Sequence, residues 1–251
     1  MRFFIALTYH GAAYSGWQSQ PNAPSVQAAL EDYLSVLLRR PTAVVGCGRT
    51  DAGVHARYYV AHFDAETELP ERFLSSVNGL LPPDIAVMRV GRVADEAHAR
   101  YDAVERDYHY EIDFVKNPFG TDRAWFFPQY ARLDFDALHE AAGLLTDYEA
   151  FAPFCKTDSG ADHYRCKLFE ARWTLRDASD PTPGMQFYIS ANRFLRGMVR
   201  LIVGACIETA LGKMRPDDIR RALETQSPLP RNLSVPPQGL ALTGVRYPFD
   251  W

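Results

Sequence analysis

A strict alternation of side-chain polarity runs through the middle of the chain. Apolar residues occupy every second position and polar residues lie between them: Tyr108, Tyr110, Ile112 and Phe114 against Asp107, His109, Glu111 and Asp113. A period of two predicts a strand with one face on a hydrophobic core and the other face toward water. The chain must therefore build a sheet with one polar face, and Tyr108 is expected on the apolar face.

Periodicity and turn residues place the other elements around this strand. Strands are expected over residues 2–9, 42–47, 57–64, 85–90, 164–176, 185–191 and 240–247. Helices are expected from Ser25 to a stop at Pro41, and over residues 73–81, 134–145 and 195–211. Strands mixed with helices and many hairpin-length connections indicate an α+β protein with largely antiparallel sheets. The 251 residues suffice for one large domain or two of ordinary size.

A glycine-bracketed stretch follows the expected strand at 42–47. Residues 46–56 read GCGRTDAGVHA, in which Arg49 and Asp51 stand two positions apart. Glycines at this density indicate a tight turn or a close approach of another group to the backbone. Because loops at strand ends commonly carry chemistry, this stretch is the first candidate site.

The residues of this loop alone leave several interpretations open. A nucleotide phosphate loop is disfavoured, because no G-K-[ST] follows and no G-x-x-G opens a helix. A glycosidase-like pair of carboxylates requires a second acid, and none is marked out by the sequence. A structural interpretation stays open as well, in which Asp51 caps a turn and Arg49 is its salt-bridge partner.

Composition limits the classes of partner and cofactor. The formal net charge is −4, and only four of the 27 basic residues are lysine. This balance argues against nonspecific coating of nucleic acid, while arginines remain available for local phosphate contacts. The apolar N-terminal run is too short for a membrane span and lacks a signal-peptide pattern, so we expect a cytoplasmic protein with no membrane association.

The cysteines predict neither a disulfide framework nor a metal site. Cys47, Cys155, Cys166 and Cys206 form no C-x-x-C pair. Cys155, His163 and Cys166 lie close in sequence, but a structural zinc site requires four ligands and no fourth is evident. We therefore expect reduced thiols, no metal and no cofactor.

A basic stripe is predicted on the helix expected at 195–211. Arg193, Arg196 and Arg200 are spaced i, i+3 and i+7 beside its apolar side. The stripe is either a solvated helix edge or a group of cations that grips phosphate or neutralises a carboxylate.

Several segments of the chain resemble the TruA-type tRNA pseudouridine synthases. GCGRTDAGVHA resembles the active-site signature of that family, and YHGAAYSGWQSQPNAPSVQAALE at 9–31 is similar to its N-terminal segment. The remaining matching segments follow in the family's order: His98-Ala-Arg100, Arg106-Asp-Tyr108, NRFLRGMVRLIVG at 192–204 and QGLALTGVRYP at 238–248. The resemblance covers essentially the whole chain.

The resemblance implies a fold and a reaction. The fold is the pseudouridine synthase fold, with two α/β halves of largely antiparallel sheet flanking a central RNA-binding cleft. The halves are expected at residues 1–98, with the catalytic loop, and 99–251, with the stacking tyrosine and the basic helix. The reaction is isomerisation of uridine to pseudouridine at positions 38, 39 and 40 of the tRNA anticodon stem-loop, by a homodimer without metal or cofactor.

The same resemblance implies roles for five residues. Asp51 matches the catalytic aspartate, and Arg49 matches an arginine thought to help extrude the target base. Tyr108 matches the tyrosine that stacks on this base, Arg200 an arginine expected to pair with the catalytic carboxylate, and Leu240 an apolar residue lining the uracil pocket. A uridine within a stem must be flipped out before its C5 edge can react, which agrees with an aromatic and a cationic residue near a carboxylate.

Three positions depart from the family pattern. His10 replaces the acid of the usual Y-D-G, and Asp107 and His109 stand where many relatives carry basic residues. These departures concern which tRNAs and which uridines are accepted. Two other hypotheses stay open: a tRNA-binding folding chaperone with little catalysis, and an aspartate-dependent hydrolase of nucleosides or glycosides.

Overall fold

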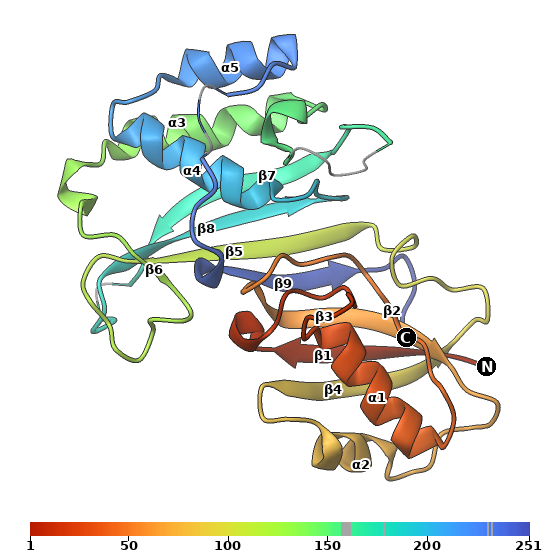
Figure 1. Cartoon of the computed structure of the whole chain (residues 1–251). Coiled ribbons are helices and arrows are strands. Elements are labelled where there is room, and N and C mark those ends of the chain that lie inside the picture. Colours follow the sequence, from red (N-terminus) through yellow and green to blue (C-terminus); the bar gives the residue numbers. More distant parts are fainter. Residues whose placement is uncertain (157–161, 178, 230, 232) are drawn as a thin grey trace. The chain divides into compact units, whose positions relative to one another are not determined.

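The computed structural model describes residues 1–156, 162–177, 179–229, 231 and 233–251. The chain divides into two compact units (Figure 1). Unit 1 contains Met1–Arg106 together with the C-terminal Ala241–Trp251, and unit 2 contains Asp107–Leu240. The last strand therefore returns the end of the chain to the unit in which it began.

Unit 1 is built on a mixed sheet. Its strands are β1 (Arg2–Tyr9), β2 (Val45–Gly46), β3 (His55–Asp64), β4 (Ile85–Val93) and β9 (Leu240–Arg246). Their order is β4-β1-β3-β9, with β2 paired to β3. β1 is antiparallel to β3 and β4, and β9 runs parallel to β3 through the pairs His55–Ala241 and Ala56–Leu242.

Both faces of the unit 1 sheet are covered, which explains why β1 is apolar almost throughout. On one face the Phe3 ring stacks on Phe63, which in turn stacks on Phe73 of helix α2 (Phe73–Leu80). On the other face Phe4 packs edge-on against Tyr247 and Trp251 of the C-terminal segment. A strand buried on both faces requires a continuous apolar run.

Helix α1 (Val26–Leu38) begins where the sequence predicts and ends slightly earlier. The Ser25 side chain caps it by accepting a hydrogen bond from the Ala28 amide at 3.2 Å. The helix ends at Leu38, and the next residue, Arg39, adopts a left-handed conformation with φ of 54°. The chain has therefore left the helix before it reaches Pro41.

Unit 2 combines a second group of strands with three α-helices. The strands β5 (Glu105–Asp113), β8 (Gly184–Ala191) and β7 (Leu168–Leu175) are neighbours in that order, and the short β6 (Trp125–Phe126) pairs with β5. Helices α3 (Phe135–Gly143), α4 (Met198–Ala210) and α5 (Pro216–Thr225) lie together on one side of β7 and β8 (Figure 1).

Single 3₁₀ turns occur in both units, at Gly11–Ala13, Tyr130–Arg132, Leu144–Asp147, Ala152–Phe154 and Pro237–Gly239.

The α+β class is confirmed, and two elements were not anticipated. β6 is only two residues long, and it pairs in parallel with β5 through Ile112–Trp125. Helix α5 did carry a local signal: Pro216 stands at its first turn, and the Arg215 amide donates to the Asp218 carboxylate at 2.9 Å. Among the residues described, no helix is long and apolar enough to cross a membrane.

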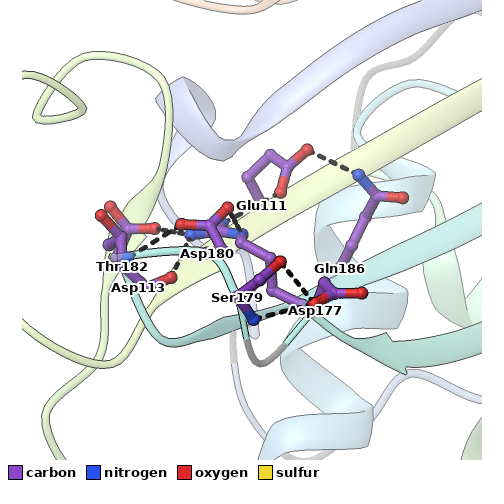
Figure 2. A network of polar contacts seen from close by, with 8 residues as sticks. Glu111, Asp113, Asp177, Ser179, Asp180, Thr182 and Gln186 are labelled. Atoms are coloured by element: carbon purple, nitrogen blue, oxygen red, sulfur yellow. Dashed lines mark hydrogen bonds and ion pairs between the residues drawn. The ribbon is translucent and has the colours of Figure 1, made fainter.

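A polar network lies at the end of β5 (Figure 2). The Arg176 guanidinium donates to Asp113 at 2.7 Å and to Glu111 at 3.1 Å, and Gln186 donates to the other Glu111 oxygen at 2.6 Å. The Asp113 side chain is only 5 % exposed. Because Arg176 directly follows β7, this ion pair fixes the turn between β7 and β8 onto β5.

Candidate active site

The glycine-rich loop connects β2 to β3, and its side chains point alternately toward solvent and toward the interior. Arg49 is exposed, Thr50 is buried and Asp51 is half-buried. The buried Thr50 hydroxyl lies 2.9 Å from the Tyr9 hydroxyl. Anchoring the middle residue inward leaves the two charged side chains on either side of it at the surface of unit 1.

The N-terminal segment packs directly against this loop. The Trp17 amide donates to the Thr50 carbonyl at 3.2 Å, and the Gly53 amide donates to the Tyr14 carbonyl at 3.3 Å. Gly16 has a φ of 97°, and a Cβ there would collide with the Thr50 carbonyl oxygen. These contacts fix the backbone on both sides of Asp51.

Arg49 contacts Gln18 and not Asp51. Its Nε donates to the Gln18 side-chain oxygen at 3.1 Å, and the Gln18 amide nitrogen donates to Gln27 at 2.8 Å. Gln27 in turn donates to Glu31 at 3.0 Å. A relay of amide side chains therefore positions Arg49 from α1, in place of the salt bridge of the structural interpretation, and the turn-capping role of Asp51 stays a prediction.

Arg106 holds the base of the loop, and sequence reasoning had assigned it no role. The residue is 9 % exposed. It donates to the carbonyls of Ala103 at 2.8 Å, Cys47 at 2.9 Å and Arg100 at 2.6 Å. A buried arginine thus joins the glycine loop to the segment 100–103 through charge-assisted hydrogen bonds. In the sequence, the feature that could have pointed to Arg106 was its position in the segment Arg106-Asp-Tyr108, which resembles the family.

The cysteine of the loop, Cys47, is buried. Burial raises the pKa of Cys47 to about 11, so at neutral pH the thiol is protonated. Among the described residues no group of three or more His, Cys, Asp or Glu side chains could hold a metal ion.

Unit 2 carries the other three residues singled out from sequence. Tyr108 lies on β5, half-buried, with its ring 5.1 Å from Phe194 in an edge-to-face arrangement. Phe194 stands in the segment between β8 and α4. The alternation places Tyr108 on the same face of β5 as Tyr110 and Ile112, which are buried, whereas Tyr108 is half-buried like its neighbours Asp107 and His109.

Arg200 and Leu240 are connected through one segment of unit 2. The Arg200 Nε donates to the Val235 carbonyl at 2.7 Å, and the Tyr110 hydroxyl donates to the Pro236 carbonyl at 2.8 Å. Leu240 follows this segment and is 6 % exposed. Arg200 and Tyr110 therefore set the path of the chain that leads to Leu240.

The predicted stripe of three arginines on one helix is wrong. α4 begins at Met198, so Arg193 and Arg196 precede it and only Arg200 lies on it. The reason is Gly197, whose φ of 71° is incompatible with a continuing right-handed helix. Arg193 instead contacts His163, with 2.9 Å between Nη1 and Nε2.

Asp107 and His109, which differ from the family pattern, lie on the face of β5 opposite to Tyr108. The Tyr188 hydroxyl donates to Asp107 at 3.1 Å, and the His109 ring is 5.2 Å from the Tyr188 ring. Both residues therefore face β8 side chains and not the environment of Tyr108. The His10 ring packs in a tilted arrangement against the ring of His55, with centroids 4.5 Å apart.

Comparison with known proteins defines the class. A family model described as tRNA pseudouridine synthase matches residues 146–248. Curated relatives match over nearly the whole chain, and each is called tRNA pseudouridine synthase A. The relative from Porphyromonas gingivalis is 43% identical over 99% of this chain and 98% of its own length, and that from Bacteroides thetaiotaomicron is 43% identical over 99% and 91%. A relative from Geobacter is 38% identical over 97% and 98%.

These matches place the chain in the class of RNA-modifying isomerases. At this identity and coverage, the chain belongs to the tRNA pseudouridine synthase A family. The resemblance seen in the sequence motifs is thereby confirmed.

Proposed function

We propose that this protein converts uridine to pseudouridine at positions 38, 39 and 40 of the tRNA anticodon stem-loop, with Asp51 as its essential carboxylate. The full-length similarity to tRNA pseudouridine synthases A carries this proposal. The geometry of unit 1 supports it, because the loop that bears Asp51 is anchored on both sides by Tyr9, Tyr14 and Trp17. Fixed geometry of this kind is what a reacting carboxylate requires.

The reaction balances without an external electron carrier. The C1′–N1 bond of uridine breaks, the uracil rotates, and a new bond forms between C1′ and C5. The proton on C5 is lost to solvent and N1 gains a proton. The site must therefore hold a detached uracil and provide an ionised carboxylate, and it requires no metal or cofactor for the change in bonding.

The other four residues bind the target nucleotide in this proposal. Arg49 helps to extrude the base, and Tyr108 stacks on the flipped uracil, a contact of about 1–3 kcal/mol by analogy with other base-stacking sites. Arg200 supplies positive charge, and Leu240 lines the uracil pocket. The central RNA-binding cleft implied by the resemblance stays a prediction.

Release of the C5 proton gives a direct assay. Unmodified tRNA transcripts labelled with tritium at uridine C5 are incubated with the protein, and tritium release is followed by position-resolved pseudouridine detection. We expect product at positions 38, 39 and 40, and a loss of at least about 10³-fold for Asp51→Ala and Asp51→Asn. Asp32→Asn, which removes an exposed carboxylate on α1, is the matched control and should retain activity.

The outcomes separate the competing functions. Tight tRNA binding by the wild type without any tritium release would favour the binding-only alternative. Release of free uracil would favour the hydrolase. Full activity of Asp51→Ala would contradict the role of the carboxylate.

We also propose that the protein acts as a homodimer that binds the anticodon arm of tRNA. Local arginines on a chain of net charge −4 suit focused phosphate contacts. Light scattering coupled to size-exclusion chromatography should give the mass of two chains, and the mass of a single chain at working concentration would contradict this.

A further inference from the structure

A cavity in unit 1 lies beside the glycine loop, and Arg100, one of its lining residues, has no role in the function proposed above. Its volume is about 180 Å³. It is lined by Trp17, Gln18, Arg49, Arg100 and the backbone around Gly46 and Gly48. This volume is below that of a pocket for a drug-sized ligand, so it suits one small group. None of its lining residues is acidic.

Two arginines without an acidic partner line this cavity. Among the described residues, the Arg49 side chain donates to Gln18, and the Arg100 side chain makes a cation-π contact with Tyr101, 5.6 Å from its ring centroid. Other arginines of the same unit are neutralised: Arg2 by Asp64 and Arg92 by Glu68. Two uncompensated guanidinium groups at one cavity form a site for an anion.

Buried structure sets these two arginines side by side at the cavity. Arg106 donates to the carbonyl of Arg100 and to that of Cys47, two residues before Arg49. The Tyr59 hydroxyl donates to the Gly48 carbonyl at 2.5 Å. The backbone of both arginines is therefore held, and their side chains are left for a ligand.

Gly48 leaves the cavity open although the fold does not require a glycine there. Its φ is not positive, and a Cβ built on it meets no atom within 4 Å. Gly46 differs, because a Cβ there would lie 2.6 Å from the Trp17 ring. Gly48 lines the cavity, and its missing side chain does not relieve a clash.

We infer that Arg49 and Arg100 bind a backbone phosphate of the substrate RNA next to the target nucleotide, in the cavity that Gly48 keeps open. This rests on the proposed function. Arg49 and Asp51 are two residues apart, so their Cα atoms are at most about 7 Å apart. A phosphate held here lies near a nucleotide presented to Asp51. Such a contact fixes the register of the RNA without reading its sequence.

Binding of unmodified tRNA transcript, measured by filter retention across a series of KCl concentrations, tests this inference. An Asp51→Asn background prevents turnover. We expect Arg100→Gln to weaken binding about tenfold at moderate salt and to lower the slope of log K against log [KCl] by about 0.7–0.9. Arg100→Lys should restore most of the slope, and the loss should be similar for different tRNAs.

Two matched controls separate a phosphate contact in the cavity from a general loss of charge or of glycine. Arg92→Gln removes one charge from an exposed ion pair of the same unit and should leave the slope unchanged. Gly48→Leu keeps all charges but fills the cavity and should also weaken binding about tenfold. Gly79→Leu, at another glycine of unit 1 whose Cβ meets open space, should not.

The inference is overturned if Arg100→Gln has the affinity and slope of Arg92→Gln, or if Gly48→Leu binds like Gly79→Leu. Thermal unfolding of each variant excludes a folding defect. The conversion assay on the wild type is separate: absence of pseudouridine would contradict the proposed function, while the binding slopes would still decide whether the phosphate site exists.

Discussion

Replacing Arg106 by lysine should destabilise unit 1 and loosen its glycine loop. The guanidinium donates to three carbonyls, those of Cys47, Arg100 and Ala103, at 2.6–2.9 Å. A hydrogen bond from a charged donor contributes about 1.5–3 kcal/mol. A lysine ammonium has one nitrogen and can keep about one of these three contacts, so Arg106→Lys should cost about 3–6 kcal/mol of the free energy of unfolding.

Two measurements check this prediction. Urea unfolding followed by tryptophan fluorescence, to which Trp17 and Trp251 of unit 1 contribute, gives the change in free energy of unfolding. Amide hydrogen exchange should speed up most over residues 46–49 and 99–104, because the carbonyls that Arg106 holds lie there. Activity should fall with the loss of order in the loop.

Arg92→Lys is the matched control for that experiment. Arg92 is 52 % exposed and paired with Glu68, and an exposed ion pair contributes about 0–1 kcal/mol. If Arg106→Lys cost no more than Arg92→Lys, and the exchange pattern were unchanged, the reasoning that assigns the loop's order to Arg106 would be refuted.

Two further predictions concern charge in the interior. Burial is the main cause that lowers the pKa of His62 to about 4 from an ordinary 6.5. Between these values the unfolded chain binds a proton that the folded protein does not, so the free energy of unfolding should fall by roughly 2–3 kcal/mol from pH 7 to pH 4. His62→Gln should flatten this dependence in urea titrations at several pH values, and the exposed His139→Gln should not. In unit 2, Arg176→Met leaves the buried Asp113 without its cation and should cost about 3 kcal/mol in urea unfolding. The exposed Arg172→Met should cost under about 1 kcal/mol, and equal costs for the two variants would contradict the importance of burial.

Local patterns predicted the elements whose signals are local. The alternation at 107–114 marked β5, and Ser25 marked the start of α1. The start of α4 was placed too early, since apolar spacing continues through Phe194 and Leu195, whereas Gly197 interrupts the helix by its backbone conformation. Apolar periodicity indicates which side chains share a face, but it carries no information on the backbone φ angle that ends or starts a helix.

By itself the sequence determined the α+β class, the family, and the loop that presents Arg49 and Asp51. Only the tertiary structure decided what holds that loop, because its contacts come from distant positions. Arg106 reaches the Cys47 carbonyl across 59 residues, and Gln18 reaches Arg49 across 31. Contacts at such separation depend on how strands pair and in which register, and this is set by burial of the whole core and not by the spacing of neighbouring residues.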